Sequence, residues 1–75
     1  MQTNTSHFTY LNIYINGEAA EITQTNLDEL IYARYQKPEH VVAELNGTVI
    51  ARSSWKTTAL KTQDRLELLS FVGGG

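Results

Sequence analysis

Two Asn-Gly pairs, Asn16-Gly17 and Asn46-Gly47, place strong limits on how this 75-residue chain can fold. Both central residues of a type I′ turn need a positive φ, so an Asn-Gly pair between apolar segments is a strong signal for a β-hairpin. The segment before the first pair alternates between apolar and polar residues, which is typical of a half-buried strand. We therefore predict two antiparallel hairpins, formed by residues 10–15 with 18–22 and by residues 41–45 with 48–51.

A short amphipathic helix is predicted between these hairpins, over residues 27–35. Its apolar stripe has the i, i+3, i+4 spacing of one helix face and consists of Leu27, Leu30 and Ile31, which Arg34 or Tyr35 can extend. Thr25 or Asn26 can cap its first turn. Pro38 prevents its continuation, because proline has no backbone N–H to donate. So short a helix needs to lie on a flat apolar surface.

The predicted final strand, residues 65–72, alternates in the same way as the first. Residues 52–63 show no regular period, apart from one short helical turn predicted around residues 53–56. The order hairpin, helix, strands predicts an α+β fold with a mixed four- to five-stranded sheet and one main helix across one face. The first and last strands then become parallel neighbours, which is the ubiquitin-like β-grasp arrangement. We expect the helix stripe to pack on Leu11, Ile13, Ile15, Leu66 and Leu68.

The predicted final strand leads directly into Gly73-Gly74-Gly75. Ordering three glycines costs conformational entropy and buries no apolar surface, so the fold gives no reason for them. Because glycine has no Cβ, a narrow channel in another protein can admit such a tail and bring its carboxylate against a nucleotide. The alternative is a frayed terminus. We expect residues 1–9 to be a flexible extension, 10–72 to form one domain and 73–75 to be a flexible tail.

Composition excludes several classes of function. No cysteine is present, so the chain has no disulfide, no thiolate nucleophile and no Cys-based metal site. A net charge of −2, with six Lys and Arg spread along the chain, argues against nucleic acid as a partner. No apolar run reaches membrane-spanning length, and residues 1–9 lack the apolar segment of a secretory signal. We therefore expect a soluble cytoplasmic protein without a membrane partner.

Side chains that could carry chemistry are scattered along the chain. His7 and His40 have no partner at metal-ligand spacing, and neither a nucleophile elbow nor a phosphate-binding glycine loop is present. Four acids of the loops and strands are expected on the solvated surface: Glu39, Glu44, Asp64 and Glu67. We expect no catalytic residue, no metal site and no stably bound cofactor. If the protein takes part in a reaction, it does so as a substrate, through its tail.

Leu69 and Phe71 alternate with the predicted core residues of the last strand, so they are expected on the opposite face of the sheet, beside the tail. Val42 has the same outward phase in the third strand. A cluster of apolar residues beside the terminus indicates a docking surface for a partner. The alternative is that residues 52–63 or 1–9 cover this face.

An ordered set of residues resembles the ThiS family, the sulfur carriers of thiamine biosynthesis. The set consists of Leu45-Asn46-Gly47, Ile50, Arg52, Trp55, Leu60, Asp64, Leu66 and Phe71-Val72-Gly73-Gly74-Gly75, and Asn16-Gly17-Glu18 is similar to the family's opening. The resemblance covers residues 11–75. Two departures are the extension of residues 1–9 and Gln63, which replaces the glycine common before the aspartate. The second departure bears on the tightness of that turn and not on the chemistry of the tail.

The resemblance implies a carrier rather than an enzyme. An E1-like enzyme would adenylate the carboxylate of Gly75 with ATP and magnesium. A cysteine desulfurase or another persulfide donor would then displace AMP and leave a C-terminal thiocarboxylate, from which thiazole synthase would take the sulfur. An α-carboxylate is ionised at neutral pH and can attack the α-phosphate without a general base.

Three alternatives stay open. The small subunit of molybdopterin synthase usually has prolines just before its terminal Val-x-Gly-Gly, where this chain has Ser70 and Phe71. Ubiquitin-like protein modifiers are generally more basic at the tail. An alternative from another class is a β-grasp protein-interaction module that binds through Leu69 and Phe71, with flexible glycines that carry no chemistry. Consumption of the terminal carboxylate distinguishes the carriers from this module.

Overall fold

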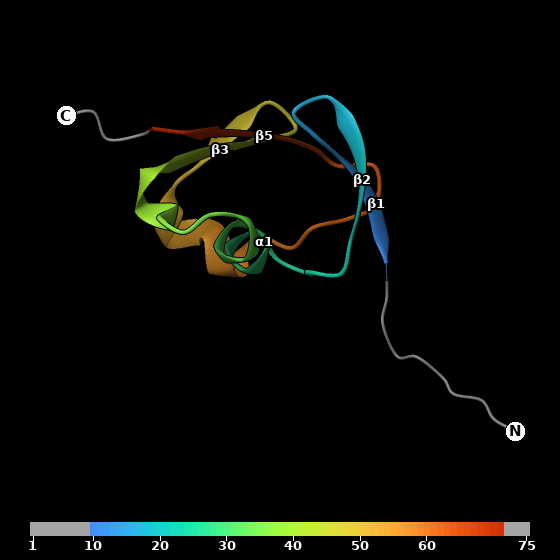
Figure 1. Cartoon of the computed structure of the whole chain (residues 1–75). Coiled ribbons are helices and arrows are strands. Elements are labelled where there is room, and N and C mark those ends of the chain that lie inside the picture. The colour runs from blue at the N-terminus through green and yellow to red at the C-terminus, as the bar shows by residue number, and fades with distance from the viewer. Residues whose placement is uncertain (1–9, 72–75) are drawn as a thin grey trace, which may run out of the picture.

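Five strands form one mixed sheet, and helix α1 lies across one of its faces (Figure 1). The computed structural model describes residues 10–71. With η for a 3₁₀ helix, the elements in chain order are β1 (Leu11–Ile15), β2 (Glu18–Ile22), α1 (Leu27–Arg34), η1 (Pro38–His40), β3 (Val41–Leu45), β4 (Thr48–Ile50), η2 (Arg52–Thr57) and β5 (Arg65–Ser70). Across the sheet the strand order is β2-β1-β5-β3-β4.

The first and last strands are parallel neighbours in the centre of the sheet. Tyr14 lies opposite Arg65 and Ile15 opposite Leu66, whereas the other strand pairs are antiparallel. Helix α1 supplies the crossover from β2 to β3, which lie on the two sides of this parallel pair. The predicted α+β fold with the β-grasp arrangement is confirmed, and the sheet has five strands.

Both predicted hairpins form, and both turn at an Asn-Gly pair. The φ angle is 52° at Asn16 and 84° at Gly17, and 52° at Asn46 and 89° at Gly47. Positive φ at both central residues is the signature of the type I′ turn, whose twist matches that of the flanking strands. Two of the four strands are one residue shorter than predicted: β1 begins at Leu11 and β4 ends at Ile50.

Asn26, rather than Thr25, caps helix α1. Its side-chain oxygen accepts a hydrogen bond of 2.8 Å from the backbone N–H of Glu29. The helix ends at Arg34, one residue before the predicted end, because Tyr35 has the extended backbone angles φ −129° and ψ 138°. Tyr35 nevertheless donates its N–H to the carbonyl of Ile31 and packs against the core.

The core lies between α1 and the sheet, as predicted. The helix stripe Leu27, Leu30 and Ile31 is fully buried with Ile13, Ile15, Leu66 and Leu68, and Ile22, Val41 and Ala43 complete the sheet side. Leu11 was expected to be part of the core, but it is only half-buried and packs against the core's border. It lies at the first position of β1, where less of the chain covers it.

Residues 52–63 contribute more than the irregular segment that the sequence predicts. The 3₁₀ helix η2 spans Arg52–Thr57 and packs beside α1, on the helix side of the sheet (Figure 1). Trp55 is only 1% exposed, and its indole N–H donates a 3.1 Å hydrogen bond to the carbonyl of Ile50. Leu60 is buried too. This segment therefore closes one end of the core.

The final strand ends at Ser70 rather than at residue 72. Phe71 follows the strand and donates its N–H to the carbonyl of His40 at 2.8 Å. The predicted flexible extension, residues 1–9, and the glycine tail lie outside the described residues. Within residues 10–71, no helix has the length and apolar character that a membrane span requires.

Candidate functional site

The face of the sheet opposite α1 carries an apolar patch, formed by Val42, Val49 and Leu69. The three side chains are 40%, 65% and 60% exposed, respectively, and Val42 lies directly opposite Leu69 in the pairing of β3 with β5. Together with Glu44 and Asn16, they line a hollow of about 640 Å³. The predicted exposure of Val42 and Leu69 is confirmed. Val49 was not predicted as part of this patch, because its position opposite Glu44 of β3 follows from the register of the second hairpin.

Phe71 is 55% exposed, as predicted, but it lines a different hollow from Leu69. There it lies with Arg34, Lys37 and His40, at the point where β5 ends. The apolar patch and Phe71 are thus neighbours along the last strand rather than one continuous cluster. A partner that bound both would contact the sheet and the end of the chain together.

Residues 52–63 do not cover the apolar patch. The segment η2 contacts α1 and lies on the helix side (Figure 1), and no residue of 52–63 lines the hollow at the apolar patch, so one predicted alternative for this patch is wrong. The other candidate cover, residues 1–9, lies outside the described residues. Exposed apolar side chains that a sheet gathers on one face are typical of a surface for a partner.

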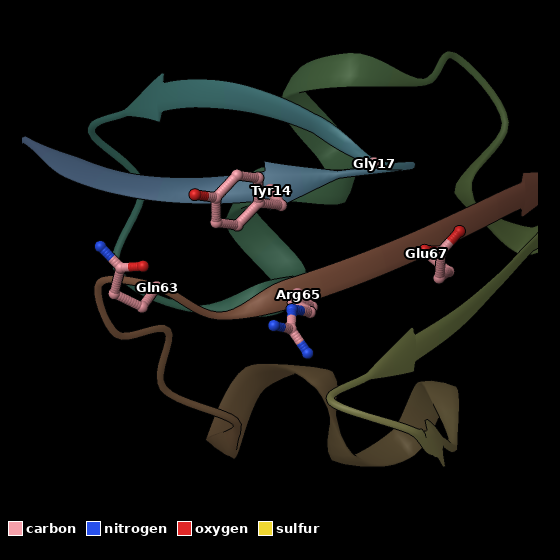
Figure 2. Close-up of a pocket in the computed structure, with 5 residues that line it drawn as sticks. All are labelled: Tyr14, Gly17, Gln63, Arg65 and Glu67. Carbon is pink, nitrogen blue, oxygen red and sulfur yellow. The ribbon is translucent and has the colours of Figure 1, made fainter.

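The rest of the open face is polar. A hollow of about 380 Å³ is lined by Tyr14 from β1 and by Arg65 and Glu67 from β5, as Figure 2 shows. Glu67 lies directly opposite Glu44 of β3 in the sheet pairing. Like charges in this position destabilise a sheet slightly. Among residues 10–71, no group of three or more His, Asp and Glu side chains is placed to hold a metal ion.

The turn residue Asn16 binds the last strand. Its side-chain oxygen accepts a hydrogen bond of 2.8 Å from the N–H of Leu68, and its side-chain nitrogen donates one of 3.2 Å to the carbonyl of Leu68. Its own backbone N–H donates to the carbonyl of Leu66 at 2.8 Å. The amide side chain therefore continues the β1–β5 pairing beyond the end of β1.

Asn46 does the same at the start of β5. Its side-chain oxygen accepts a bond of 2.8 Å from the N–H of Arg65, and its backbone N–H donates to the carbonyl of Arg65 at 2.8 Å. Both hairpin turns thus hold the strand that leads to the glycine tail. The sequence predicts only the turn geometry of these asparagines. The one signal for their second role is that both first turn positions are Asn rather than Gly or Asp.

Asp64 is buried, at 6% exposure, although a solvated position was predicted for it. Its carboxylate accepts hydrogen bonds from the side chain of Asn46 at 3.0 Å and from the N–H of Lys61 at 2.8 Å. A buried carboxylate needs such donors, since they replace the water it has lost. The turn that precedes Asp64 forms although Gln63 stands where the ThiS family commonly has glycine. Gln63 adopts a φ of 74° there.

Arg52, one of the residues that carry the family resemblance, links η2 to α1. Its guanidinium donates a hydrogen bond of 3.3 Å to the hydroxyl of Tyr32, and this bond raises the pKa of Arg52 above its ordinary value. Because arginine is charged at any physiological pH, the raised pKa changes nothing in its protonation there. Both residues are exposed, so the contact is a surface link rather than a reactive pair.

Val72 and Gly73-Gly74-Gly75 lie outside the described residues. What the structure does place is the origin of the tail: the N–H of Phe71 is bonded to the carbonyl of His40, and Asn16 and Asn46 hold β5 behind it. The candidate site therefore consists of a firmly held strand end, an exposed Phe71 and an apolar patch beside it.

Comparisons with known proteins agree with this architecture. The model of the ThiS family matches residues 13–75. A crystal structure of the thiamine biosynthesis protein ThiS from Geobacter metallireducens superimposes with a TM-score of 0.73 at 35% identity, covering 87% of this chain and 100% of that one. A solution structure of a thiamine biosynthesis protein from the same organism gives a TM-score of 0.71 at 35% identity, covering 87% and 88%.

Two relatives known from sequence are also similar. A thiazole synthase from Magnetococcus marinus is 32% identical over 66 residues, which are 87% of this chain. The chain spans only 20% of the length of that thiazole synthase. The uncharacterized protein ycf40 of Pyropia yezoensis is 33% identical over 66 residues, which are 87% of this chain and 93% of ycf40.

Proposed function

Since this chain belongs to the ThiS family, we propose that it is a sulfur carrier in thiamine biosynthesis and that the carboxylate of Gly75 carries the sulfur. The observation that carries this proposal is the extent of the family match, which runs through the triple glycine to residue 75. The likeness to the Geobacter metallireducens thiamine biosynthesis protein supports it, because the fold and 35% of the aligned residues agree.

The first proposed step is adenylation of Gly75. A carboxylate is a poor electrophile because its negative charge is delocalised over both oxygens and repels nucleophiles. A nucleophile that did attack its carbon would also have to expel oxide or hydroxide, which are poor leaving groups. Attack of a Gly75 oxygen on the α-phosphate of ATP releases pyrophosphate and converts that oxygen into part of a good leaving group, AMP. An E1-like enzyme would supply ATP and magnesium for this step, which the carrier enters as a substrate.

The second proposed step transfers sulfur. The terminal sulfur of a protein persulfide attacks the activated carbonyl carbon and AMP leaves, so that an acyl disulfide forms. A second thiol then attacks the sulfur of the donor protein and releases the thiocarboxylate of Gly75. The carrier has no cysteine, so both the persulfide and the thiol belong to partners such as a cysteine desulfurase.

Thiazole synthase is the proposed acceptor of the sulfur. The similarity of this chain to a segment of the Magnetococcus marinus thiazole synthase supports this assignment. A thiocarboxylate is a better nucleophile than a carboxylate, because sulfur is more polarizable than oxygen. The sulfur attacks an electrophilic carbon of the acceptor and forms a thioester with it. An oxygen nucleophile such as water then cleaves the bond between the carbonyl carbon and the sulfur, so that the sulfur stays on the acceptor and the carrier regains a carboxylate that can be adenylated again. We place this cycle in the cytoplasm, which supplies ATP.

The apolar patch and Phe71 are the proposed docking surface for these partners. Val42, Leu69 and Phe71 are exposed and lie on or beside the strand that ends at the tail. Burial of apolar surface drives association, and a patch next to the reacting terminus brings the tail to the partner's active site at the same time. The glycines 73–75 lack side chains and so fit a narrow channel.

The mass of the C-terminal peptide tests the proposal. The carrier is incubated with ATP, magnesium, the E1-like enzyme of the same organism and a persulfide donor, and the C-terminal peptide is then analysed by mass spectrometry. Its mass should rise by the difference between sulfur and oxygen. A protein-interaction module that binds through the same patch would keep an unmodified Gly75, and this result with an active E1-like enzyme would favour that second function.

A further inference from the structure

A hollow of about 460 Å³ lies where β5 ends, and its lining gathers positive charge. Arg34 comes from the last turn of α1, Lys37 from the loop after it and His40 from η1. Phe71, the last described residue of the chain, lines the same hollow. We call this feature the basic hollow. Residues that are separate in sequence thus surround the root of the tail.

The basic hollow is unusual for this protein, whose net charge is −2. No carboxylate is among its lining residues in the described part of the chain, whereas four other hollows of the described surface each include Asp28, Glu44 or Glu67. Glu39 is the neighbour of His40 in sequence, but it is not in the lining either.

Backbone hydrogen bonds hold the basic hollow against the strand end. The N–H of Phe71 donates to the carbonyl of His40 at 2.8 Å, and the N–H of His40 donates to the carbonyl of Lys37 at 2.9 Å. Arg34 is the last residue of α1, where a cation also interacts favourably with the helix dipole. The backbone at Lys37 and His40 therefore keeps a defined position relative to Phe71, where the tail begins.

The length of the tail limits what the basic hollow can contact. Four residues follow Phe71, and a fully extended chain of four spans at most about 14 Å. A tail threaded fully extended into a nucleotide site would place the α-phosphate up to about 14 Å from the hollow. Side chains at the rim of the channel, where the tail enters, would lie closer to the hollow than ATP does. The counter-charge nearest to the hollow then belongs to the rim.

We propose that the basic hollow receives carboxylate side chains from the E1-like adenylating enzyme, at the rim where the tail enters. This inference rests on the function proposed above and adds the charge of the surface that the partner presents. Arg34 offers a planar set of donors that matches a carboxylate, and Lys37 adds a second positive charge. Complementary charge at a rim speeds encounter and sets orientation more than it adds affinity. The hollow thus directs the tail toward the channel, while the apolar patch supplies contact area.

Adenylation kinetics of matched charge variants test this assignment. The first variant is Arg34→Glu with Lys37→Glu. The control is Lys56→Glu with Lys61→Glu, which makes the same change of net charge at exposed cations outside the basic hollow. A third variant, Arg34→Gln with Lys37→Gln, removes the charges without introducing acids at the end of α1. Pyrophosphate release is measured against carrier concentration with the E1-like enzyme at saturating ATP, at low and high ionic strength, after circular dichroism has confirmed folding.

The reversed variant should raise the KM for the carrier about tenfold or more at low ionic strength and leave kcat nearly unchanged. The Gln variant should raise the KM for the carrier by a smaller factor, and the control should change this KM much less. High salt should reduce the differences in KM between the variants. Equal KM values for the control and the reversed variant would overturn the inference. An adenylated wild-type carrier would in that case leave the proposed function standing. A wild-type carrier that is never adenylated would overturn both.

Discussion

Asn16 and Leu68 are 52 positions apart in the chain, yet the side chain of one forms two hydrogen bonds with the backbone of the other. The amide group of Asn16 presents a donor and an acceptor at the spacing of a backbone peptide. The side chain therefore pairs with β5 in the place where a further residue of β1 would pair if the strand continued past Ile15. One residue satisfies two demands, the positive φ of the hairpin and the pairing of the last strand.

Replacing Asn16 by Gly separates these two demands. Glycine adopts a positive φ readily, so the turn should persist, but both side-chain bonds to Leu68 are lost. The two backbone groups of Leu68 are partly buried, and we expect a loss of about 1–3 kcal/mol of unfolding free energy, measured by urea denaturation. Asn16→Ala should lose more, because alanine is strained at positive φ. A Gly variant as stable as the wild type would show that water replaces the lost bonds.

Gln63→Gly should stabilise the domain slightly. Gln63 has a φ of 74°, a conformation that costs a non-glycine residue about 1–2 kcal/mol. Glycine removes this strain but loses about 0.5–1 kcal/mol through its larger freedom in the unfolded chain, so a net gain of up to about 1.5 kcal/mol is expected. Gln63→Ala is the control, since it keeps the strain. In thermal unfolding, the Gly variant should have the highest melting temperature of the three proteins. A melting temperature below that of the wild type would contradict the strain argument.

Leu30→Ala should cost about 2–5 kcal/mol, because Leu30 is fully buried between α1 and the sheet. For so small a domain this is a large share of the total stability. Leu69→Ala makes the same chemical change on the open face, where the side chain is 60% exposed, and should change stability by less than about 0.5 kcal/mol. Chemical denaturation of the pair measures the difference, and similar losses for both would mean that Leu69 belongs to the core.

Phe71→Asp should weaken adenylation while the melting temperature stays nearly unchanged. Phe71 is 55% exposed in the free protein, so its replacement removes little packing, whereas a charge at a docking contact is unfavourable once the partner has expelled water. The measurements are the rate of pyrophosphate release with the E1-like enzyme and a thermal melt. A variant that unfolds would assign Phe71 to the structure of the domain instead.

Deletion of Gly75 should abolish adenylation and leave the fold and docking intact. The carboxylate moves back by one residue, about 3.3–3.6 Å, which takes it out of reach of the α-phosphate. Gly74→Ala should impair the reaction for steric reasons, again without loss of stability. Binding to the E1-like enzyme is measured by calorimetry and adenylation by pyrophosphate release. Full activity after the deletion would show that the terminal position is not the reacting group.

Local sequence patterns predicted the hairpins and the helix because the forces that form them act between near neighbours. Asn16-Gly17 and Asn46-Gly47 determine turn geometry within two residues, and the stripe from Leu27 to Ile31 determines one helix face. The outward phase of Leu69 followed from alternation along a single strand. These elements needed no knowledge of the rest of the chain.

Features that join distant segments could not be predicted in this way. Trp55 becomes buried because η2 packs beside α1, and no period in residues 52–63 signals that contact. Asp64 appeared to be a surface acid because its partner Asn46 lies 18 positions earlier in the chain. The three basic residues of the basic hollow lie close together in sequence, within residues 34–40, but their position beside the root of the tail arises only because the end of β5 lies next to η1.

The parallel pairing of β1 with β5 has a mechanical consequence. A partner that pulls on the C-terminus applies force along β5, and this force loads the bonds to both neighbouring strands in shear, all at once, instead of peeling them apart one by one. The two asparagine side chains brace the same strand at separate points. Tension on the terminus is therefore shared by the pairings of β5 with β1 and with β3. The domain can thus stay folded while an enzyme acts on the few residues that follow β5.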